Sequence, residues 1–347
     1  MSFAYRGRRA AVLENDALRV TVLEQGGHIA EIYDKQAGVN PLWTPPWRSI
    51  EPSTYTPETH PEYGREPDAL LLAGIMGHNL CLDTFGAPSP EELAAGMPVH
   101  GEGSVVRYEV RNTEGYLITT ARLPRAELLF ERRIKLRQRA VNITETVENL
   151  SSSDRPIAWT EHVTLGPPFL KCGETQFRAT ATRSKVFARE FGIADYLTAA
   201  AEFEWPHAPR PDGGFADLQV FSEAAASSAF TTHLMNPARE CAFFVAFAPS
   251  FHLAFGYIWK QSDFPWMGIW EENHSRMNAP WNGQSLARGM EFGVSPFPES
   301  RRAMTERASL FGVPTYRWLP ARGRAEVEFW ALTRKSEAIP ESLEWPD

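Results

Sequence analysis

The feature that most constrains the fold of this chain is an alternation of apolar and polar residues with a period of two. It is first seen at Leu18, Val20 and Val22, which alternate with Arg19 and Thr21. Similar runs recur along the sequence, at residues 106–111, 130–137, 141–147, 157–163, 251–259 and 327–331. Successive side chains of a strand point to opposite faces, so each run predicts a half-buried β-strand.

Turn signals separate these runs, and few helical segments lie between them. The turn Gln25–Gly26–Gly27 joins the first run to a second strand-like segment, HIAEIYD. A short helix is indicated at Ser89–Glu92, where a capping serine precedes a proline and two acids. This pattern favours an all-β fold, a large antiparallel β-sandwich with few short helices. No low-complexity linker or clear repeat interrupts it, so residues 1–347 are expected to form a single domain.

Composition restricts the partners of the chain. The net charge of −8 disfavours nucleic acid, because affinity for a phosphate backbone comes mainly from Lys and Arg. No apolar stretch is long enough to span a membrane, and the N-terminal MSFAYRGRRA has charges where a signal peptide needs an apolar run. The three cysteines, Cys81, Cys172 and Cys241, are widely spaced and are read as reduced thiols, with a single disulfide left open. A cytoplasmic protein is expected.

Three polar residues stand out as candidates for chemistry. Glu291 lies in ARGMEFGVSPFPES, between a strand-like run and a proline-rich turn, three residues after Arg288. Two histidines precede it, His100 in a loop and His162 on a predicted strand. A carboxylate and a histidine can work as general base and general acid near neutral pH. The nine histidines show no HxH, HxxxH or HExxH spacing, so spacing predicts no metal site; convergence of His78, His100 and His162 with Glu161 on an ion stays open.

These segments, in this order, resemble the aldose 1-epimerases, or galactose mutarotases. The opening LRVTVLEQGGHIAEIYD is similar to the family's first hairpin, and GHNLCLDTFGAPSPEELAAGMPVHGEG to the turn before its first active-site histidine. ITETVENLSSSDRPIAWTEHVTLGPPF resembles the segment that carries the catalytic histidine, and RGMEFGVSPFPES the segment that carries the catalytic glutamate. The resemblance covers most of the chain and implies the family's large β-sandwich.

The resemblance also implies a reaction. Interconversion of sugar anomers opens the hemiacetal ring: a base takes the proton of the anomeric hydroxyl while an acid protonates the ring oxygen. Glu291 would be the base and His162 the acid, and His100 would hold a ring substituent. The expected protein is an isomerase that acts on a small-molecule sugar and needs no cofactor.

Departures from the family bear on the substrate. The arginine that many mutarotases carry before the first histidine is missing from GIMGHNLCLD, so either His78, Asn79 or Asp83 is expected to replace it or the substrate differs. Glu102 follows His100 where related sugar-phosphate epimerases have an arginine, which favours an unphosphorylated sugar. Arg288 would bind a sugar hydroxyl, tune Glu291 or pair with a substrate carboxylate, with a structural salt bridge as the alternative.

Aromatic residues and other function classes complete the expectations. Trp270, followed by Glu271, Glu272 and Asn273, is expected at the rim of the site, whereas Trp266 and Trp281 are expected in the core. Two alternatives stay open at this point: a sugar-binding protein without turnover, and lyase or hydrolase chemistry on the same scaffold.

Overall fold

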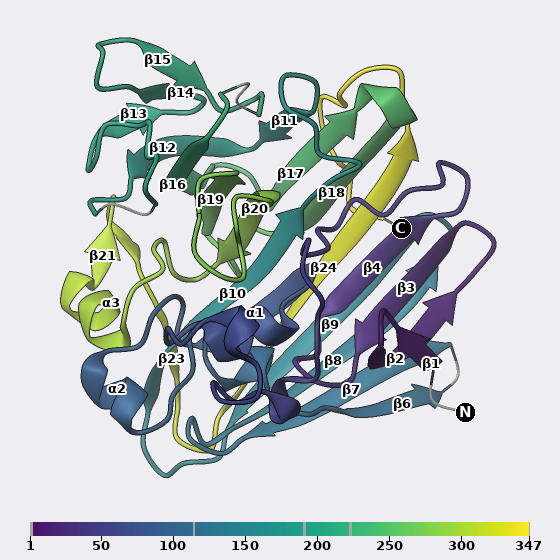
Figure 1. Cartoon of the computed structure of the whole chain (residues 1–347), viewed down its shortest axis with the longest axis vertical. Helices are drawn as coiled ribbons and strands as arrows, with labels where there is room; N and C mark the ends of the chain where they lie inside the picture. Colours follow the sequence, from purple (N-terminus) through teal and green to yellow (C-terminus); the bar gives the residue numbers. More distant parts are fainter. Residues whose placement is uncertain (1–2, 114, 190–191, 222–223, 347) are drawn as a thin grey trace.

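The computed structural model describes residues 3–113, 115–189, 192–221 and 224–346, and two large antiparallel sheets dominate it (Figure 1). The first sheet has 12 strands in the order β1-β2-β3-β4-β5-β10-β20-β19-β16-β12-β13, with β23 paired to β10. Its strands are β1 (Phe3–Tyr5), β2 (Arg8–Glu14), β3 (Leu18–Leu23), β4 (Ile29–Asp34), β5 (His78–Asp83), β10 (Arg155–Leu165), β12 (Ala181–Val186), β13 (Glu202–Glu204), β16 (Ser227–Met235), β19 (Trp266–Asn273), β20 (Leu286–Gly293) and β23 (Arg317–Leu319).

The second sheet has eight strands in the order β11-β17-β18-β24-β9-β8-β7-β6. They are β6 (Glu109–Thr113), β7 (Tyr116–Leu123), β8 (Leu128–Arg137), β9 (Ala140–Asn149), β11 (Gln176–Ala179), β17 (Cys241–Ala248), β18 (Leu253–Lys260) and β24 (Arg324–Lys335). Two small hairpins, β14 (His207–Pro209) with β15 (Phe215–Asp217) and β21 (Ser309–Leu310) with β22 (Val313–Pro314), complete the strands. The predicted all-β antiparallel sandwich is confirmed.

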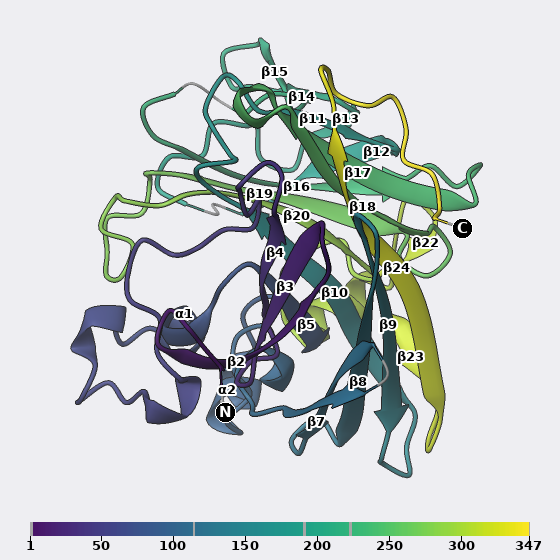
Figure 2. The same cartoon turned by 90° about the vertical axis from the view of Figure 1, so that its right-hand side faces the viewer.

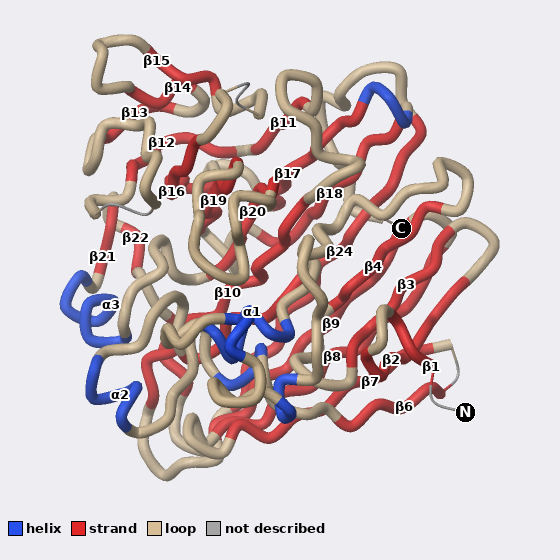
Figure 3. Tube along the Cα trace, viewed as in Figure 1, coloured by secondary structure: helices blue, strands red, loops and turns tan. Residues whose placement is uncertain are grey.

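Helix is confined to a few short segments (Figure 3). They are α1 (Ala69–Gly74), α2 (Pro90–Ala94), α3 (Arg301–Arg307) and the single 3-10 turns η1 (Pro52–Thr54), η2 (Pro61–Tyr63), η3 (Glu102–Ser104) and η4 (Pro249–Phe251). The predicted cap of α2 is present: Ser89 Oγ accepts from the amide of Glu92, whose carboxylate accepts from the amide of Ser89. Figure 2 shows α1 and α2 on the side of the first sheet that faces away from β8 and β9.

The main core fills the space between the two large sheets. From the first sheet it takes Trp159, Val163 and Phe292, and from the second Phe130 and Trp259. The rings of Trp259 and Phe292 stack across this interface with their centroids 4.2 Å apart. Among the described residues, no helix is long and apolar enough to cross a lipid bilayer.

A charged cluster interrupts the apolar core. Arg132 lies on the core face of β8 with its side chain 1% exposed, and its Nε donates to Glu145 Oε1 over 2.5 Å. The same guanidinium donates to Glu161 Oε2 over 3.1 Å, and this oxygen lies 2.7 Å from His78 Nε2. The cluster therefore connects β8 and β9 of the second sheet to β5 and β10 of the first.

The other face of the first sheet carries His162 of β10 and Glu291 of β20. On β10, Ile157, Trp159 and Val163 face the core, so His162, at the opposite parity, faces away from it. Strand β20 pairs with β10 so that His162 and Glu291 are direct partners. Strand β19 pairs with β20 so that Gly268 is opposite Glu291. The sheet alone thus aligns one histidine and one carboxylate.

Candidate active site

A cavity of about 350 Å³ lies over this outer face of the first sheet. His162 and Glu291 line it from the sheet, and His100 lines it from the loop before η3. The three residues that the sequence placed in three distant segments therefore converge on one cavity. We call it the site cavity.

His162 and Glu291 contact each other inside the site cavity. His162 Nε2 lies 3.0 Å from Glu291 Oε1, and both side chains are at most 6% exposed. The second ring nitrogen, Nδ1, is 3.1 Å from the hydroxyl of Thr164, two residues along β10 and on the same face. Because a carboxylate oxygen accepts, the proton on His162 Nε2 is directed at Glu291. Among the described residues, Glu291 Oε2 has no hydrogen-bond partner, so it is left for a ligand.

His100 is held by its own loop. The backbone N–H of Gly86 donates to its Nδ1 over 3.1 Å, and its ring stacks on Phe85 at 5.9 Å. Its centroid is 5.2 Å from that of His162. Burial and repulsion by the charge of His162 hold the pKa of His100 well below its ordinary value. His100 is therefore neutral near pH 7, and since Nδ1 accepts, its proton is on Nε2.

The turn around His100 explains why it enters the cavity. His100 itself has a left-handed backbone, with φ of 65°, and Gly101 follows with φ of 78°. A Cβ at Gly101 would collide with the carbonyl oxygen of Leu82 on β5, so only glycine fits there. The close approach of this loop to β5 brings His100 beside His162.

Trp270 forms part of the wall, as its sequence neighbourhood indicated. Its ring lies 5.9 Å from that of His162 and is 6% exposed. The indole Nε1 is buried and, in the part of the chain described, has no acceptor. Trp281, expected in the core, also lines the cavity and meets Trp270 edge to face at 6.1 Å. Trp281 is buried in a hydrophobic cluster, as expected, and lines the cavity in addition; Trp266 is fully buried as expected.

Three charged residues that line the cavity were missed by sequence reasoning: Asp68, Arg189 and Arg276. Arg276, from the loop after β19, lies over the rings of Trp281 and Trp270, at 4.8 and 5.6 Å. Asp68 precedes α1 and also lines the cavity. Burial raises the pKa of Asp68 above its ordinary value, and the nearby charge of Arg276 opposes that rise. The stretch FPWMGIWEENHSRMNAPW, rich in Trp with one arginine, was the signal that could have identified Arg276.

Arg288 does not reach the cavity. It lies on β20 three residues before Glu291, and an odd separation on a strand places two side chains on opposite faces. Its side chain is fully buried: Nη2 donates to Leu218 O over 2.6 Å, and the guanidinium covers the Phe177 ring at 4.0 Å. The structural alternative for Arg288 therefore describes it better than the substrate-binding one.

His78 and Asp83 are also outside the site cavity. His78 faces the core, between Glu161 Oε2 at 2.7 Å and the hydroxyl of Tyr257 at 3.0 Å. Asp83 is the last residue of β5, and its Oδ1 accepts two hydrogen bonds. Arg155 Nε and Arg301 Nη1 each donate to it over 2.6 Å. Burial alone would raise the pKa of Asp83, but these hydrogen bonds lower it below its ordinary value. Both residues serve the structure, so the expectation that either replaces the missing arginine is corrected.

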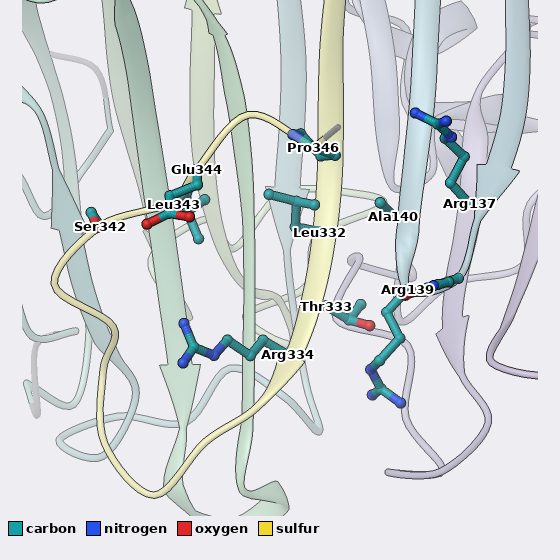
Figure 4. Close-up of a pocket in the computed structure, with 11 residues that line it drawn as sticks. Arg137, Arg139, Ala140, Leu332, Thr333, Arg334, Ser342, Leu343, Glu344 and Pro346 are labelled. Atoms are coloured by element: carbon teal, nitrogen blue, oxygen red, sulfur yellow. The ribbon is translucent and has the colours of Figure 1, made fainter.

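In the described ranges, no three His, Cys, Asp or Glu side chains are grouped so that they could hold a metal ion. His78 and Glu161 are on the core face of the sheet, opposite to His162. A larger hollow, of about 950 Å³, lies where residues 342–346 pass β24 (Figure 4). Arg137, Arg139 and Arg334 line it, and Arg139 is ion-paired with Asp34. With no acid–base pair on its walls, it does not compete with the site cavity.

Known proteins resemble this chain in structure but not in sequence. No protein-family model matches the chain, and no curated protein matches it in sequence. Its structure is similar to a Klebsiella pneumoniae protein named as a candidate aldose 1-epimerase, with a TM-score of 0.66, 12% identity, and 96% of this chain and 82% of that chain covered. An Escherichia coli K12 protein with the same name gives a TM-score of 0.61 at 14% identity over 94% and 99% of the chains.

A third solved structure, a galactose mutarotase-like protein from Lactobacillus casei, gives a TM-score of 0.56 at 13% identity over 94% and 100% of the chains. Identities this low establish the fold and leave the activity to be argued from the site. The order of strands in both sheets, the short helices and these similarities agree on one architecture. The chain has the galactose mutarotase-like fold.

Proposed function

We propose that this protein is an isomerase of the aldose 1-epimerase type, which interconverts the anomers of a free reducing sugar. The observation that carries the proposal is the 3.0 Å contact between His162 Nε2 and Glu291 Oε1 on the wall of the site cavity. The anomeric hydroxyl oxygen and the ring oxygen are bonded to the same carbon. A base and an acid that contact each other can therefore reach both oxygens of one bound sugar.

In the proposed reaction, Glu291 takes the proton of the anomeric hydroxyl and His162 delivers a proton to the ring oxygen. The C1–O bond of the ring breaks, the hydroxyl oxygen becomes the aldehyde oxygen, and C1 rotates about its bond to C2. Attack of the ring-forming hydroxyl on the other face of the aldehyde reverses both proton transfers. No net proton or electron is consumed, so the chain's own side chains are sufficient.

His100 and Trp270 would orient the sugar. Neutral His100 offers its Nε2–H to an oxygen of the substrate, since Nδ1 is occupied by the Gly86 amide. The indole N–H of Trp270 is a second donor on the cavity wall. The buried indole N–H of Trp270 needs an acceptor, and a sugar hydroxyl can supply it.

We also propose that the substrate is unphosphorylated, because of the charges near Trp270. Glu102, on which the sequence argument relied, is turned away and accepts from the amides of Arg125 and Ala126. What favours a neutral sugar is the charge balance beside Trp270: Arg276 Nε lies 3.4 Å from Glu272 Oε2 and also faces the carboxylate of Asp68. A phosphate there would have to compete with two carboxylates.

The test is anomer equilibration, followed by polarimetry or NMR from a freshly dissolved single anomer, for a panel of free aldoses. Glu291→Gln removes the base and keeps the shape, and Glu306→Gln on the exposed face of α3 is the matched control. Loss of acceleration in Glu291→Gln alone supports the proposal. Sugar binding by calorimetry without any acceleration by the wild type would instead establish the sugar-binding alternative.

A further inference from the structure

Much of the wall of the site cavity is apolar. Three phenylalanines meet there, with ring centroids 6.2 Å apart for Phe85 and Phe230 and 6.0 Å apart for Phe187 and Phe230. They come from the loop after β5, the segment after β12 and strand β16. We call Phe85, Phe187 and Phe230 the phenylalanine wall. Val99 and three side chains at α1 extend the apolar lining: Leu71, Leu72 and Ile75.

The phenylalanine wall is next to the reacting groups. Gly268 is opposite Glu291 in the sheet, and a Cβ at Gly268 would meet the Phe230 ring at 2.7 Å and Glu291 Cβ at 3.6 Å. The Phe230 ring therefore occupies the space that a larger residue at 268 would take, beside the carboxylate. Phe85 stacks on His100 at 5.9 Å. A sugar with its anomeric carbon at Glu291 would therefore lie close to the Phe230 ring.

Other residues of the cavity carry polar groups, among them the exposed Arg189, two residues after Phe187. Asp68 precedes α1, and Arg276 lies over Trp270 and Trp281. Together with His100 Nε2 and Trp270 Nε1, they can bind hydroxyls on their own side of the sugar. Phenylalanine offers neither donor nor acceptor, so a hydroxyl that faces the phenylalanine wall loses its water and gains no partner.

We propose that the substrate is a deoxy sugar, a reducing sugar in which a C–H or methyl group replaces a hydroxyl and faces Phe85, Phe187 and Phe230. This inference rests on the proposed function and specifies its substrate class. The remaining hydroxyls face His100, Trp270, Asp68 and Arg276. A buried hydroxyl without a partner costs a fully hydroxylated sugar about tenfold or more in kcat/KM relative to its deoxy counterpart.

The experiment compares matched pairs. The rate of anomer equilibration is measured with the purified full-length protein for glucose, galactose and mannose, each against its 2-deoxy and 6-deoxy counterparts of the same configuration. At least one deoxy sugar is expected to exceed its parent by about tenfold or more in kcat/KM. Phe230→Tyr, which adds a hydroxyl to the wall, is expected to narrow that preference, whereas Phe3→Tyr, on the exposed strand β1, leaves it unchanged.

The outcomes separate the two proposals. If the protein accelerates anomer equilibration but kcat/KM for every parent sugar equals or exceeds that for its deoxy counterparts, the deoxy-sugar inference is overturned. The proposed function then stands. If no sugar is accelerated, the proposed function fails, and calorimetry with the same pairs decides the inference on binding alone. Preferential binding of a deoxy sugar then supports it, and equal or absent binding overturns it.

Discussion

His162 and Glu291 are direct partners across the β10–β20 ladder, and their side chains meet with Nε2 and Oε1 3.0 Å apart. The contact is a property of the sheet, because antiparallel pairing sends the side chains of two directly opposed residues to the same face. Glu161, one residue before His162, points to the core instead and accepts from Arg132 and Trp159. A shift of one residue in register would exchange these two environments.

His100 is expected to act as a neutral hydrogen-bond donor. Replacement by leucine removes the donor and should lower kcat/KM for the sugar substrate about 10- to 100-fold. Replacement by glutamine keeps an N–H near the position of Nε2 and should restore part of the loss. Steady-state rates of anomer equilibration for both variants are the measurement. Full activity of the leucine variant would show that His100 has no role in binding.

Trp270 is expected to contribute one hydrogen bond and a stacking surface. Trp270→Phe keeps most of the surface and removes the donor, so KM should rise about tenfold while kcat changes little. Trp266→Phe is the control, since the Trp266 indole donates to Pro314 O, outside the site cavity. A fall in kcat without a change in KM would contradict a role in substrate binding and favour one in the transition state.

Arg132 is expected to be essential for stability, although it is far from the chemistry. Arg132→Leu leaves Glu145 and Glu161 buried without their shared cation, which should lower the free energy of unfolding by about 3–5 kcal/mol. Arg133→Leu is the matched control. Arg133 is the next residue on β8, is exposed and pairs with Glu131 at the surface, so the loss should be below about 1 kcal/mol. Chemical denaturation compares the two. Equal losses would refute the role of the buried cluster.

The buried His233 is expected to make stability depend on pH. Burial and the nearby charge of Arg288 lower the pKa of His233 to about 3, from an ordinary value near 6.5 in the unfolded chain. Between these values the unfolded state binds a proton that the folded state does not, so the free energy of unfolding falls as pH decreases. This one residue contributes about 1.4 kcal/mol per pH unit.

The measurement is the free energy of unfolding between pH 7 and pH 5 for the wild type and for His233→Gln. The variant should lose less stability on acidification, by about 2 kcal/mol over this range. His207→Gln, at an exposed position on β14, should keep the slope of the wild type. An unchanged slope in His233→Gln would contradict the assignment of the pKa.

The sequence was sufficient for the fold because half-buried strands repeat their pattern locally. The alternation at residues 18–22 and 157–163 became β3 and β10, and the cap at Ser89 became the start of α2. The sequence also predicted which face of the sheet His162 is on, because that depends only on its spacing from Trp159 along the strand. The convergence of His100, His162 and Glu291 followed from the resemblance in segment order and not from periodicity.

The errors came from proximity in sequence. Arg288 was expected to lie beside Glu291. Because the two residues are an odd number of positions apart on one strand, their side chains point to opposite faces of the sheet. His78 was assigned to the site by its segment, and parity on β5 sends it to the core beside Glu161. Asp68 and Arg276 come from loops whose path depends on tertiary packing. No local pattern marks Asp68, and for Arg276 the only signal was the Trp-rich stretch around it. The phenylalanine wall likewise combines three distant segments.

The central claim is that His162 and Glu291 act as one unit on one anomeric centre. The most direct test is a double-mutant cycle of anomer-equilibration rates for Glu291→Gln, His162→Gln and the double variant. If the two residues share one reaction step, each single variant should lose about 10²- to 10⁴-fold in kcat, and the double variant should be little slower than the worse single. Losses that multiply, or a single variant that keeps the wild-type rate, would contradict the account.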